Sequence, residues 1–578
     1  MNILGISAWY HDSAAALLID GEVVGAIQEE RFTRKRHDAD FPALAVAACL
    51  ELGGLCEDQL DAVVFYDKPL LKFERILDTH AATWPLSLPS FLKALPVWLS
   101  EKLWLTRNIG RKLPAYRGPI LYSGHHLSHA ASAYYSSPFD EAAVLTVDGV
   151  GEWTTCSLGV GRGNHLALKR EIRFPHSLGL LYSAITGYLG FKVNSGEYKV
   201  MGLAPYGEPR YRAELGKLLA VRADGSFALN LDYFAYAGGL RMFNRRLERL
   251  FGRKARAPDE PVEAFHKDVA RSLQEATEDA MLALAHAAHR ETGAKALCLA
   301  GGVALNCVAN GRIVREGPFE SVFVQPAAGD AGGALGAAQL LAHNVRGEPR
   351  HPLTHAYLGP TGRPEESRAL AATLGVPYAD FTGDPDGLLR AVVERLGRQE
   401  VVGFFHGRME FGPRALGHRS ILADPRSPEM RDRVNEKVKM REGFRPFAPA
   451  VPEERCAEWF DLDVPSPYML LTAPVLRREI PAVTHVDGSA RVQTVSRASS
   501  PRFHRLLELW GESTGCPVLV NTSFNVRGEP LVATAQDAYR CFRGSGLDAL
   551  VLDDLLFDKA AMPPDPVFDD WHRQFAPD

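Results

Sequence analysis

The sequence predicts an α/β protein built from two domains. Its 578 residues exceed the length at which a chain usually divides into separate hydrophobic cores. Short apolar strands alternate with helical stretches, and one pattern of two strands joined by a tight turn occurs twice in the first third of the chain. A shift to Pro and Gly near residue 346 marks a boundary. We therefore expect a first domain at 1–345, a linker at 346–366 and a second domain at 367–578.

The overall composition is that of an ordinary globular protein. Hydrophobic residues make up 46% and charged residues 23% of the chain, and the formal net charge is −5. That charge gives no general attraction to nucleic acid or to an anionic membrane. The eight cysteines are scattered without a C-x-x-C pair, which is typical of a reducing cytoplasm rather than of a disulfide framework or a zinc ribbon.

No targeting or membrane-spanning segment stands out. The first residues lack a secretion signal, and no uninterrupted apolar run is long enough to span a bilayer. The segment 84–105 comes closest, but its prolines and charges favour an amphipathic cap over a cleft. We expect a cytoplasmic protein with neither a membrane nor a nucleic-acid partner.

The first domain opens with three strands and a hairpin. An Asp-Gly pair after the second strand is a strong hairpin signal. The short polar loop between the first two strands would present His11 at the end of a strand. The strands are expected at residues 3–7, 13–19 and 23–28.

The same plan returns later in this domain. Strands at 143–147 and 153–160 flank a turn that begins with Asp148. The repetition is one of pattern rather than of sequence. Two such strand-turn-strand units facing each other resemble the arrangement by which the actin, hexokinase and Hsp70 type of ATPase, the ASKHA fold, holds a nucleotide between duplicated lobes. The first domain is therefore expected to have this duplicated architecture.

Two histidines and two aspartates form a candidate metal site. His125 and His129 are four residues apart, so on a helix their rings would project from one face and could bind one ion. Histidines at this spacing also occur as surface or core pairs, so the metal interpretation needs partners. Asp148 and Asp330 each lie where an apolar strand runs into a glycine turn. The zinc-protease pattern H-E-x-x-H does not apply, because no glutamate lies between the histidines.

Other positions in the first domain are suited to a nucleotide. Gly301 and Gly302 end a strand before a helix, where a phosphate or ribose could approach free backbone N–H groups, although a tight turn needs glycine too. Glu197 and Lys199 lie in a glycine-containing segment that forms either a solvated turn or a contact to ribose or phosphate. The neighbouring helices and strands are expected at 262–291, 294–300, 304–313 and 321–324.

The second domain is marked by arginines set among glycine and proline. Residues 401–450 hold ten Lys or Arg against six Asp or Glu. Cations fixed on such loops suit bidentate binding of phosphates, whereas a helical charge run would be a solvated face. Nucleic acid is disfavoured, because no basic stripe with interleaved aromatic residues accompanies them. Helices are expected at 364–374 and 386–397, and a strand at 401–405.

Taken together, these motifs resemble the O-carbamoyltransferases that modify antibiotics and nodulation factors, including the nebramycin-type aminoglycoside 6''-O-carbamoyltransferases. The likeness covers nearly the whole chain. It is carried, in order, by Gly5–Ala15, the histidine pair, Asp148-Gly149, Gly196–Pro205, Gly301–Asn306, Phe411–Gly417 and Asn521–Asn525.

The resemblance implies a role for each candidate residue. The first domain would be similar to the metal-dependent transferase of tRNA threonylcarbamoyl-adenosine synthesis, and the second to its adenylate-forming, YrdC-like partner. His11 would face the acceptor hydroxyl, and His418 receives no role. The metal ligands would be His125, His129, Asp148 and Asp330. The nucleotide of the first domain would meet Glu197, Lys199, Gly301, Gly302 and Asn306. Carbamoyl phosphate and ATP would be held in the second domain by Arg414, Lys439, Arg445, Arg491, Asn521 and Arg527.

The implied reaction has two stages. Carbamoyl-adenylate would form from carbamoyl phosphate and Mg-ATP in the second domain, and the carbamoyl group would pass to a hydroxyl of a small metabolite or glycoside in the first. The mixed His and Asp ligands suit Fe(II), with Mn(II) or Zn(II) as alternatives. An internal passage between the sites is expected, because the adenylate hydrolyses easily.

Two other functions could use the same fold. A non-catalytic, actin-like scaffold would bind ATP without releasing pyrophosphate when carbamoyl phosphate is added. A kinase is disfavoured, because four potential ligands, two of them histidine, exceed what Mg-ATP requires. The sequence specifies neither the carbamoyl acceptor nor the oligomeric state.

Overall fold

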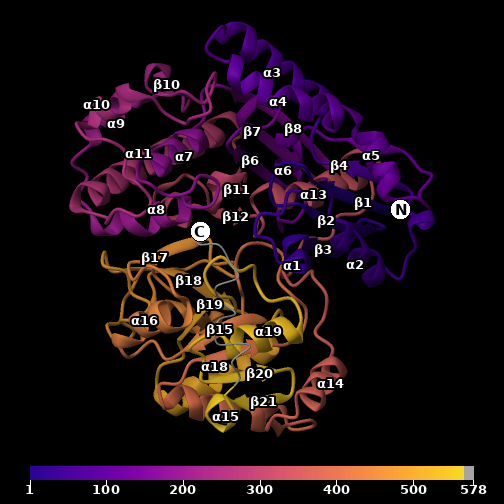
Figure 1. Cartoon of the computed structure of the whole chain (residues 1–578), viewed down its shortest axis with the longest axis vertical. Helices are drawn as coiled ribbons and strands as arrows, with labels where there is room; N and C mark the ends of the chain where they lie inside the picture. Colours follow the sequence, from indigo (N-terminus) through magenta and orange to yellow (C-terminus); the bar gives the residue numbers. More distant parts are fainter. Residues whose placement is uncertain (565–578) are drawn as a thin grey trace. The chain divides into compact units, whose positions relative to one another are not determined.

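The computed structural model describes residues 1–564 and has the predicted α/β class, with two compact units (Figure 1). The first unit contains residues 1–29 and 37–353, and the second contains 30–36 and the chain from 354 onward. The break after residue 353 falls inside the segment expected as the linker. No sequence pattern points to the assignment of residues 30–36 to the second unit.

A five-stranded sheet of order β3-β2-β1-β4-β5 opens the first unit. β1 runs antiparallel to β2 and parallel to β4. Asp20 and Gly21 both have positive φ, as a type I′ turn requires, so this pair closes the predicted hairpin between β2 and β3. The strands are β1 (Asn2–Ser7), β2 (Ala14–Ile19), β3 (Glu22–Gln28), β4 (Ala62–Phe65) and β5 (Ile120–Tyr122).

A second sheet, of order β12-β11-β6-β7-β8, repeats the topology of the first. In each sheet the strand that comes first in the chain lies at the centre. On one side of it each strand pairs antiparallel with its neighbour, and on the other side each strand pairs parallel with its neighbour. This confirms the predicted duplicated, actin-like architecture. The strands are β6 (Glu141–Val147), β7 (Thr154–Arg162), β8 (His165–Arg173), β11 (Ala296–Ala300) and β12 (Ser321–Val324).

Two helices lie between these sheets and pack on each other. α13 (Asp330–Gln339) packs on β1 and β2, and α6 (His125–Tyr134) packs on β6 and β11. Their close approach depends on a small residue, because a Cβ on Gly336 would lie 1.8 Å from the carbonyl oxygen of Ser128. The contact brings the first residue of α13 beside the first turns of α6.

Three helices are inserted between β4 and β5, namely α3 (Pro69–Thr83), α4 (Leu88–Ser100) and α5 (Leu105–Lys112). No helix among residues 1–564 is both long and apolar enough to cross a membrane. The other α-helices of the first unit include the long helix expected there, α11 (Ala264–Thr292). The rest are α2 (Ala43–Gly53), α7 (Leu178–Tyr188), α8 (Glu197–Leu203), α9 (Arg212–Leu218), α10 (Arg245–Phe251) and α12 (Cys307–Glu316).

The second unit is built on a nine-stranded mixed sheet of order β13-β21-β20-β14-β15-β19-β16-β18-β17. Helices α15 and α18 pack on it, with Phe503 and Trp510 fully buried. The strands and helices are β13 (Ala379–Asp380), β14 (Val402–Phe405), β15 (Arg419–Ala423), β16 (Ala448–Pro452), β17 (Leu471–Pro474), β18 (Ser489–Val495), β19 (Leu519–Ser523), β20 (Ala549–Leu552), β21 (Leu555–Asp558), α1 (Glu30–Thr33), α14 (Pro364–Leu374), α15 (Pro385–Gly397), α16 (Glu429–Arg433), α17 (Cys456–Trp459), α18 (Pro501–Thr514) and α19 (Ala535–Arg543).

Candidate functional site

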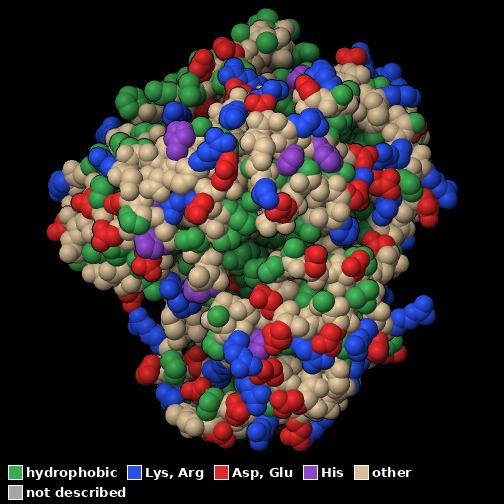
Figure 2. Space-filling view, turned by 180° about the vertical axis from the view of Figure 1, so that it is seen from behind, with side chains coloured by type: hydrophobic (Ala, Val, Ile, Leu, Met, Phe, Trp, Pro, Cys, Tyr) green, Lys and Arg blue, Asp and Glu red, His purple; other side chains and the backbone are tan. Residues whose placement is uncertain are grey.

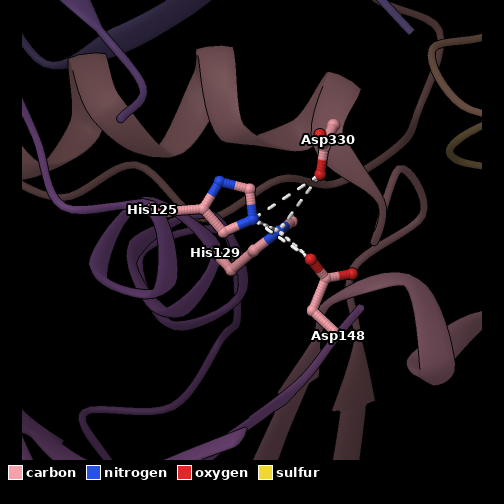
Figure 3. Close-up of side chains that lie close together, drawn as sticks. All are labelled: His125, His129, Asp148 and Asp330. Carbon is pink, nitrogen blue, oxygen red and sulfur yellow. Dashed lines mark hydrogen bonds and ion pairs between the residues drawn. The ribbon is translucent and has the colours of Figure 1, made fainter. Parts of the chain in front are cut away.

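Four potential metal ligands converge where α6 and α13 meet (Figure 3). His125 and His129 project from successive turns of α6, and their Nε2 atoms lie 3.2 Å apart. Asp148 follows β6, and one of its carboxylate oxygens lies 3.1 and 3.8 Å from these nitrogens. Asp330 begins α13, and one of its oxygens lies 3.7 and 3.6 Å from them. The structure thus brings together all four residues that the sequence singles out.

The spacing of these atoms fits one bound ion. Metal–ligand bonds of about 2.0–2.2 Å place neighbouring ligand atoms of one ion about 3.0–3.6 Å apart. Both histidines and Asp330 are almost fully buried, so their facing nitrogen and oxygen atoms have little access to bulk water. A set of two imidazoles and two carboxylates is suited to Fe(II), Mn(II) or Zn(II).

The electrostatics of the cluster keep the carboxylates ionised. Burial by itself would raise the pKa of Asp148 and of Asp330, but the neighbouring histidines lower both below the usual range. Burial would likewise lower the pKa of His125, yet Asp330 and Asp148 raise it. Two anionic side chains in a buried pocket attract positive charge, which a divalent cation supplies.

Two further residues hold the cluster in place, and no sequence pattern points to either. Tyr66 follows β4, and its hydroxyl donates to the second oxygen of Asp330 at 3.2 Å. Glu152 lies in the turn after β6 and accepts the backbone N–H of His125 at 3.0 Å and that of Lys68 at 2.9 Å. Glu152 thereby satisfies a free N–H at the start of α6, where a negative charge is favourable.

His11 lies at the edge of this cluster, in the loop after β1. Its Nε2 is 3.9 Å from an oxygen of Asp330, and its Nδ1 is 3.0 Å from Asp12. Although burial lowers the pKa of His11, Asp330 and Asp12 together raise it to about 9. A neutral, proton-accepting His11 therefore requires the negative charge of the aspartates to be offset, as a divalent cation would do.

The nucleotide candidates of the first unit lie on α8 and at the start of α12. Asn306 caps α12 and exchanges two amide hydrogen bonds with Gln274, each of 3.0 Å. Glu197 accepts a hydrogen bond of 2.7 Å from the Ser183 hydroxyl, and Lys199 is buried. The nucleotide role of Glu197, Lys199 and Asn306 stays a prediction.

The two glycines before α12, Gly301 and Gly302, each have a structural role that involves no ligand. Gly301 has a φ of 90°, and a Cβ there would lie 2.3 Å from the carbonyl oxygen of Val147. The N–H of Gly302 donates to Asp148 at 2.8 Å. The sequence suggests that this N–H is free to bind a phosphate. In the structure it is instead used to orient a carboxylate of the metal cluster.

In the second unit, Lys439 is the most buried of the predicted phosphate-binding cations. Its ammonium donates to the backbone carbonyls of Ser523 and Asn525 at 2.6 and 2.8 Å and to the Asn525 side chain at 2.5 Å. Burial, together with the charge of Arg441, lowers the pKa of Lys439 well below its usual range. Lys439 is thus suited to fix the backbone that follows β19.

Other predicted cations gather near the same loop. Arg445 and Arg527 lie 3.7 and 3.6 Å from the two oxygens of Glu442, and the N–H of Arg527 donates to the carbonyl of Lys439 at 3.2 Å. Arg414 lies on the loop that precedes β15. Glu442 thus brings together the guanidinium groups of Arg445 and Arg527 from two separate loops.

The central strands contribute the remaining polar candidates. Asn521 on β19 is fully buried and donates to Gln493 on β18 at 2.6 Å. Arg491 lies two residues before Gln493 on the same strand, so both side chains point to one face of the sheet. Gln493 in turn donates to the carbonyl of Leu416, at 2.8 Å, in the loop that carries Arg414.

His418, for which the family resemblance implies no role, packs inside the second unit. Its ring stacks on Tyr357 with 3.6 Å between centroids, and its Nδ1 lies 2.7 Å from the carbonyl oxygen of Arg408. Burial lowers the pKa of His418 to about 4. The side chain is therefore a neutral, structural one at ordinary pH.

Arg34, from the segment 30–36, anchors the loop that carries Arg527. Its guanidinium donates to the carboxylate of Glu529 at 2.6 Å and to the next two backbone carbonyls at 2.9 and 2.6 Å. The Glu529 side chain is fully buried, and burial raises its pKa to about 7 even though Arg34 acts in the opposite direction. No sequence pattern points to this pair.

Replacing Arg34 with methionine should destabilise the protein by about 1–3 kcal/mol near neutral pH, because the buried Glu529 side chain and two backbone carbonyls lose their hydrogen-bond donor. The loss should be smallest below pH 4.5, the pKa of an unfolded glutamate, where Glu529 is protonated in both states, and should grow as the pH rises through 7. Urea unfolding of both proteins across this range measures the difference. Adding Glu529→Gln to Arg34→Met should recover part of the stability; a double variant less stable than Arg34→Met would contradict the assignment.

Comparison with known proteins identifies the family to which the chain belongs. The family model described as carbamoyltransferase N-terminus matches residues 2–339, and that described as carbamoyltransferase C-terminus matches residues 393–559. The chain is 38% identical to the nodulation protein NolNO of Sinorhizobium fredii over 98% of its own length and 81% of that protein. It is 50% identical to the protein sll1178 of Synechocystis over 99% of each chain. It is also 32% identical to the nodulation protein U of Rhizobium tropici over 97% of this chain and 96% of that one. The chain therefore belongs to the carbamoyltransferase family and is an enzyme that transfers a carbamoyl group.

Proposed function

We propose that this carbamoyltransferase uses ATP and carbamoyl phosphate and works in two stages, one in each unit. The observation that carries the proposal is the presence of two chemically different sites. The first unit holds a buried His and Asp cluster, which is suited to a metal that polarises a carbonyl group. The second unit holds fixed cations on loops around Lys439, which are suited to crowded phosphates.

The first stage takes place in the second unit. Water cleaves carbamoyl phosphate to carbamate and phosphate. A carbamate oxygen then attacks the α-phosphorus of Mg-ATP, the bond to pyrophosphate breaks, and carbamoyl-adenylate forms. The guanidinium groups of this unit reduce the repulsion between the reacting anions, while Lys439 and Asn521 hold the loops in position. The groups that contact these anions are Arg414, Arg445, Arg491 and Arg527.

The second stage takes place in the first unit. The hydroxyl oxygen of the acceptor attacks the carbamoyl carbon, the bond to AMP breaks, and His11 accepts the hydroxyl proton. General base action of this kind contributes about 10²- to 10⁴-fold to a rate. A divalent metal held by the two histidines and two aspartates, for which we propose Fe(II) with Mn(II) or Zn(II) as alternatives, supplies Lewis-acid polarisation of the carbamoyl carbonyl. The adenylate is held by the candidates on α8 and at the start of α12.

The test is incubation with Mg-ATP, isotopically labelled carbamoyl phosphate and a panel of hydroxyl-bearing metabolites, followed by mass spectrometry. We expect pyrophosphate, AMP and an acceptor that carries one labelled carbamoyl group. A phosphorylated acceptor, or a carbamoylated one formed without ATP cleavage, would show that the two-stage scheme is wrong.

Metal removal should separate the stages. After dialysis against a chelator and return of Mg alone, we expect carbamoyl-phosphate-dependent release of pyrophosphate to persist and transfer to the acceptor to stop. Addition of Fe(II), Mn(II) or Zn(II) one at a time then identifies the ion that restores transfer. Full restoration of transfer by Mg alone would refute a transition-metal site at His125.

A further inference from the structure

The inserted helices carry an exposed hydrophobic surface that the proposed reaction does not use. Half of the large hydrophobic side chains that lie exposed in residues 1–564 fall between positions 70 and 104. Leu86 is 81% exposed, Trp84 60% and Trp104 56%. Contiguous apolar patches are rare on soluble monomers unless they bind something. The members of this α3–α5 surface are Leu70, Leu71, Leu77, Trp84, Leu86, Leu88, Leu92, Val97, Leu99 and Trp104.

Helix α4 shows how the sequence builds this surface. Leu88, Leu92 and Leu99 are four and seven residues apart, so they form one stripe along the helix, and all three are exposed. Trp98, about 100° around the helix from Leu99, is buried and packs on Phe73 of α3 with 5.6 Å between ring centroids. The helix therefore has apolar side chains on its inner and its outer face. In the space-filling view, hydrophobic side chains gather at the upper margin of the molecule, where Figure 1 places α3 and α4 (Figure 2).

The same segment is basic, in contrast to the rest of the chain. Residues 84–117 contain six Lys or Arg and one Asp or Glu, a local charge of +5, whereas the whole chain carries −5. Lys93 extends from α4 beside the apolar stripe, and Arg107, Arg111 and Lys112 extend from α5 just after Trp104; all four are exposed. Apolar and aromatic side chains flanked by cations are the composition of a helix that lies in the interface of an anionic lipid layer.

The inner side of α3 reaches the metal cluster. Lys72 pairs with Asp67, and its ammonium lies 5.6 Å from the ring centre of Tyr66, the residue that donates to Asp330. Arg75 donates to the carbonyl of Gly151, at 2.6 Å, in the turn after β6. α3 thus carries exposed members of the α3–α5 surface and also contacts residues that flank the candidate transfer site.

We propose that the α3–α5 surface docks on an anionic lipid surface, so that carbamoyl transfer takes place beside the lipid. The docking rests on the surface itself, and its link to catalysis rests on the proposed function. A second copy of the chain is a poorer occupant, because a symmetric contact would place two segments of charge +5 against each other. The sequence-based expectation of no membrane partner relied on whole-chain charge and on the lack of a spanning segment. Neither bears on docking through this segment.

Sedimentation with lipid vesicles tests the proposal without any acceptor. We expect the full-length protein to bind vesicles of phosphatidylcholine mixed with phosphatidylglycerol, to bind pure phosphatidylcholine much less, and to lose binding at high salt. Leu86→Glu with Trp104→Glu should abolish binding. Arg111→Gln with Lys112→Gln should weaken it about thirtyfold, since each basic residue near such a surface contributes about fivefold.

A matched control lies in the second unit. Leu476 is 56% exposed and is not a member of the α3–α5 surface, so Leu476→Glu makes the same chemical change outside that surface and should leave vesicle binding unchanged. Circular dichroism and cooperative thermal unfolding of every variant, compared with the unchanged protein, show that both units are folded. Failure of pyrophosphate release in the unchanged protein counts against the proposed function rather than against docking. Absence of binding to the anionic vesicles overturns the inference. A dimer that Leu86→Glu converts to monomer also overturns it, because the surface is then an interface between copies.

Discussion

Replacement of His125 with alanine should abolish carbamoyl transfer, by about a thousandfold or more, and leave pyrophosphate release close to that of the unchanged protein. His125 has the shortest contacts within the cluster, at 3.1 Å to Asp148 and 3.2 Å to His129, so its loss removes one ligand from the centre of the set. Polarisation of a carbonyl by a metal is worth several kcal/mol, and about 4 kcal/mol corresponds to a thousandfold. Bound metal measured by elemental analysis should fall in parallel.

The neighbouring histidine provides a matched control. His126 is equally buried but turns toward Thr146, whose hydroxyl lies 2.6 Å from its Nδ1, and burial lowers its pKa to about 3. His126→Asn should retain the metal and most of the transfer activity. Equal loss of metal in both variants would mean that any change on α6 disturbs the helix. Loss of pyrophosphate release in His125→Ala would show that the stages are not divided between the units.

Replacement of Lys439 with methionine should have the opposite effect: pyrophosphate release should be lost and the metal site kept. We expect carbamoyl-phosphate-dependent pyrophosphate release to fall by about a hundredfold or more, because the ammonium that joins Ser523 to Asn525 is lost and the cations of that loop are no longer held in position. The metal content should be unchanged. Transfer should fail only because carbamoyl-adenylate is not made, so the addition of chemically prepared carbamoyl-adenylate should restore transfer.

Lys437 serves as the control for this experiment. It lies two residues away in the same helical turn but is exposed, so Lys437→Met removes the same charge without touching the loop after β19. This variant should release pyrophosphate normally. If Lys439→Met and Lys437→Met behave alike, the effect of residue 439 comes from general charge and not from the hydrogen bonds that it donates.

Much of the first unit follows from local signals. The Asp20-Gly21 pair accounts for the first hairpin, and the spacing of His125 and His129 places both rings on one helix face, because these patterns depend on neighbouring residues only. The repeated strand-turn-strand pattern was sufficient to predict the duplicated sheets. The pairing of Asp148 with Asp330 could be proposed from their strand-end positions.

The parts that could not be predicted depend on contacts between distant segments. Tyr66 reaches Asp330 because α13 packs on β4, and this packing requires a small residue, since a Cβ on Gly333 would lie 2.6 Å from the Tyr66 ring. Gly302 looks like a phosphate-binding residue in sequence, yet its N–H is used by Asp148. A local pattern predicts which helix, strand or turn carries a side chain, whereas tertiary packing decides which partners its polar atoms contact.

The placement of residues 30–36 in the second unit has a consequence for how the chain is made. A ribosome completes these residues long before their partners, since the whole remainder of the first unit is synthesised between them and residue 354. Arg34 therefore stays solvated while the first unit forms, and it pairs with the buried Glu529 only when the last part of the chain has emerged. Nor can one cut divide the enzyme into two working halves. A fragment that begins at residue 354 contains every strand of the nine-stranded sheet but lacks the cation that the buried Glu529 requires.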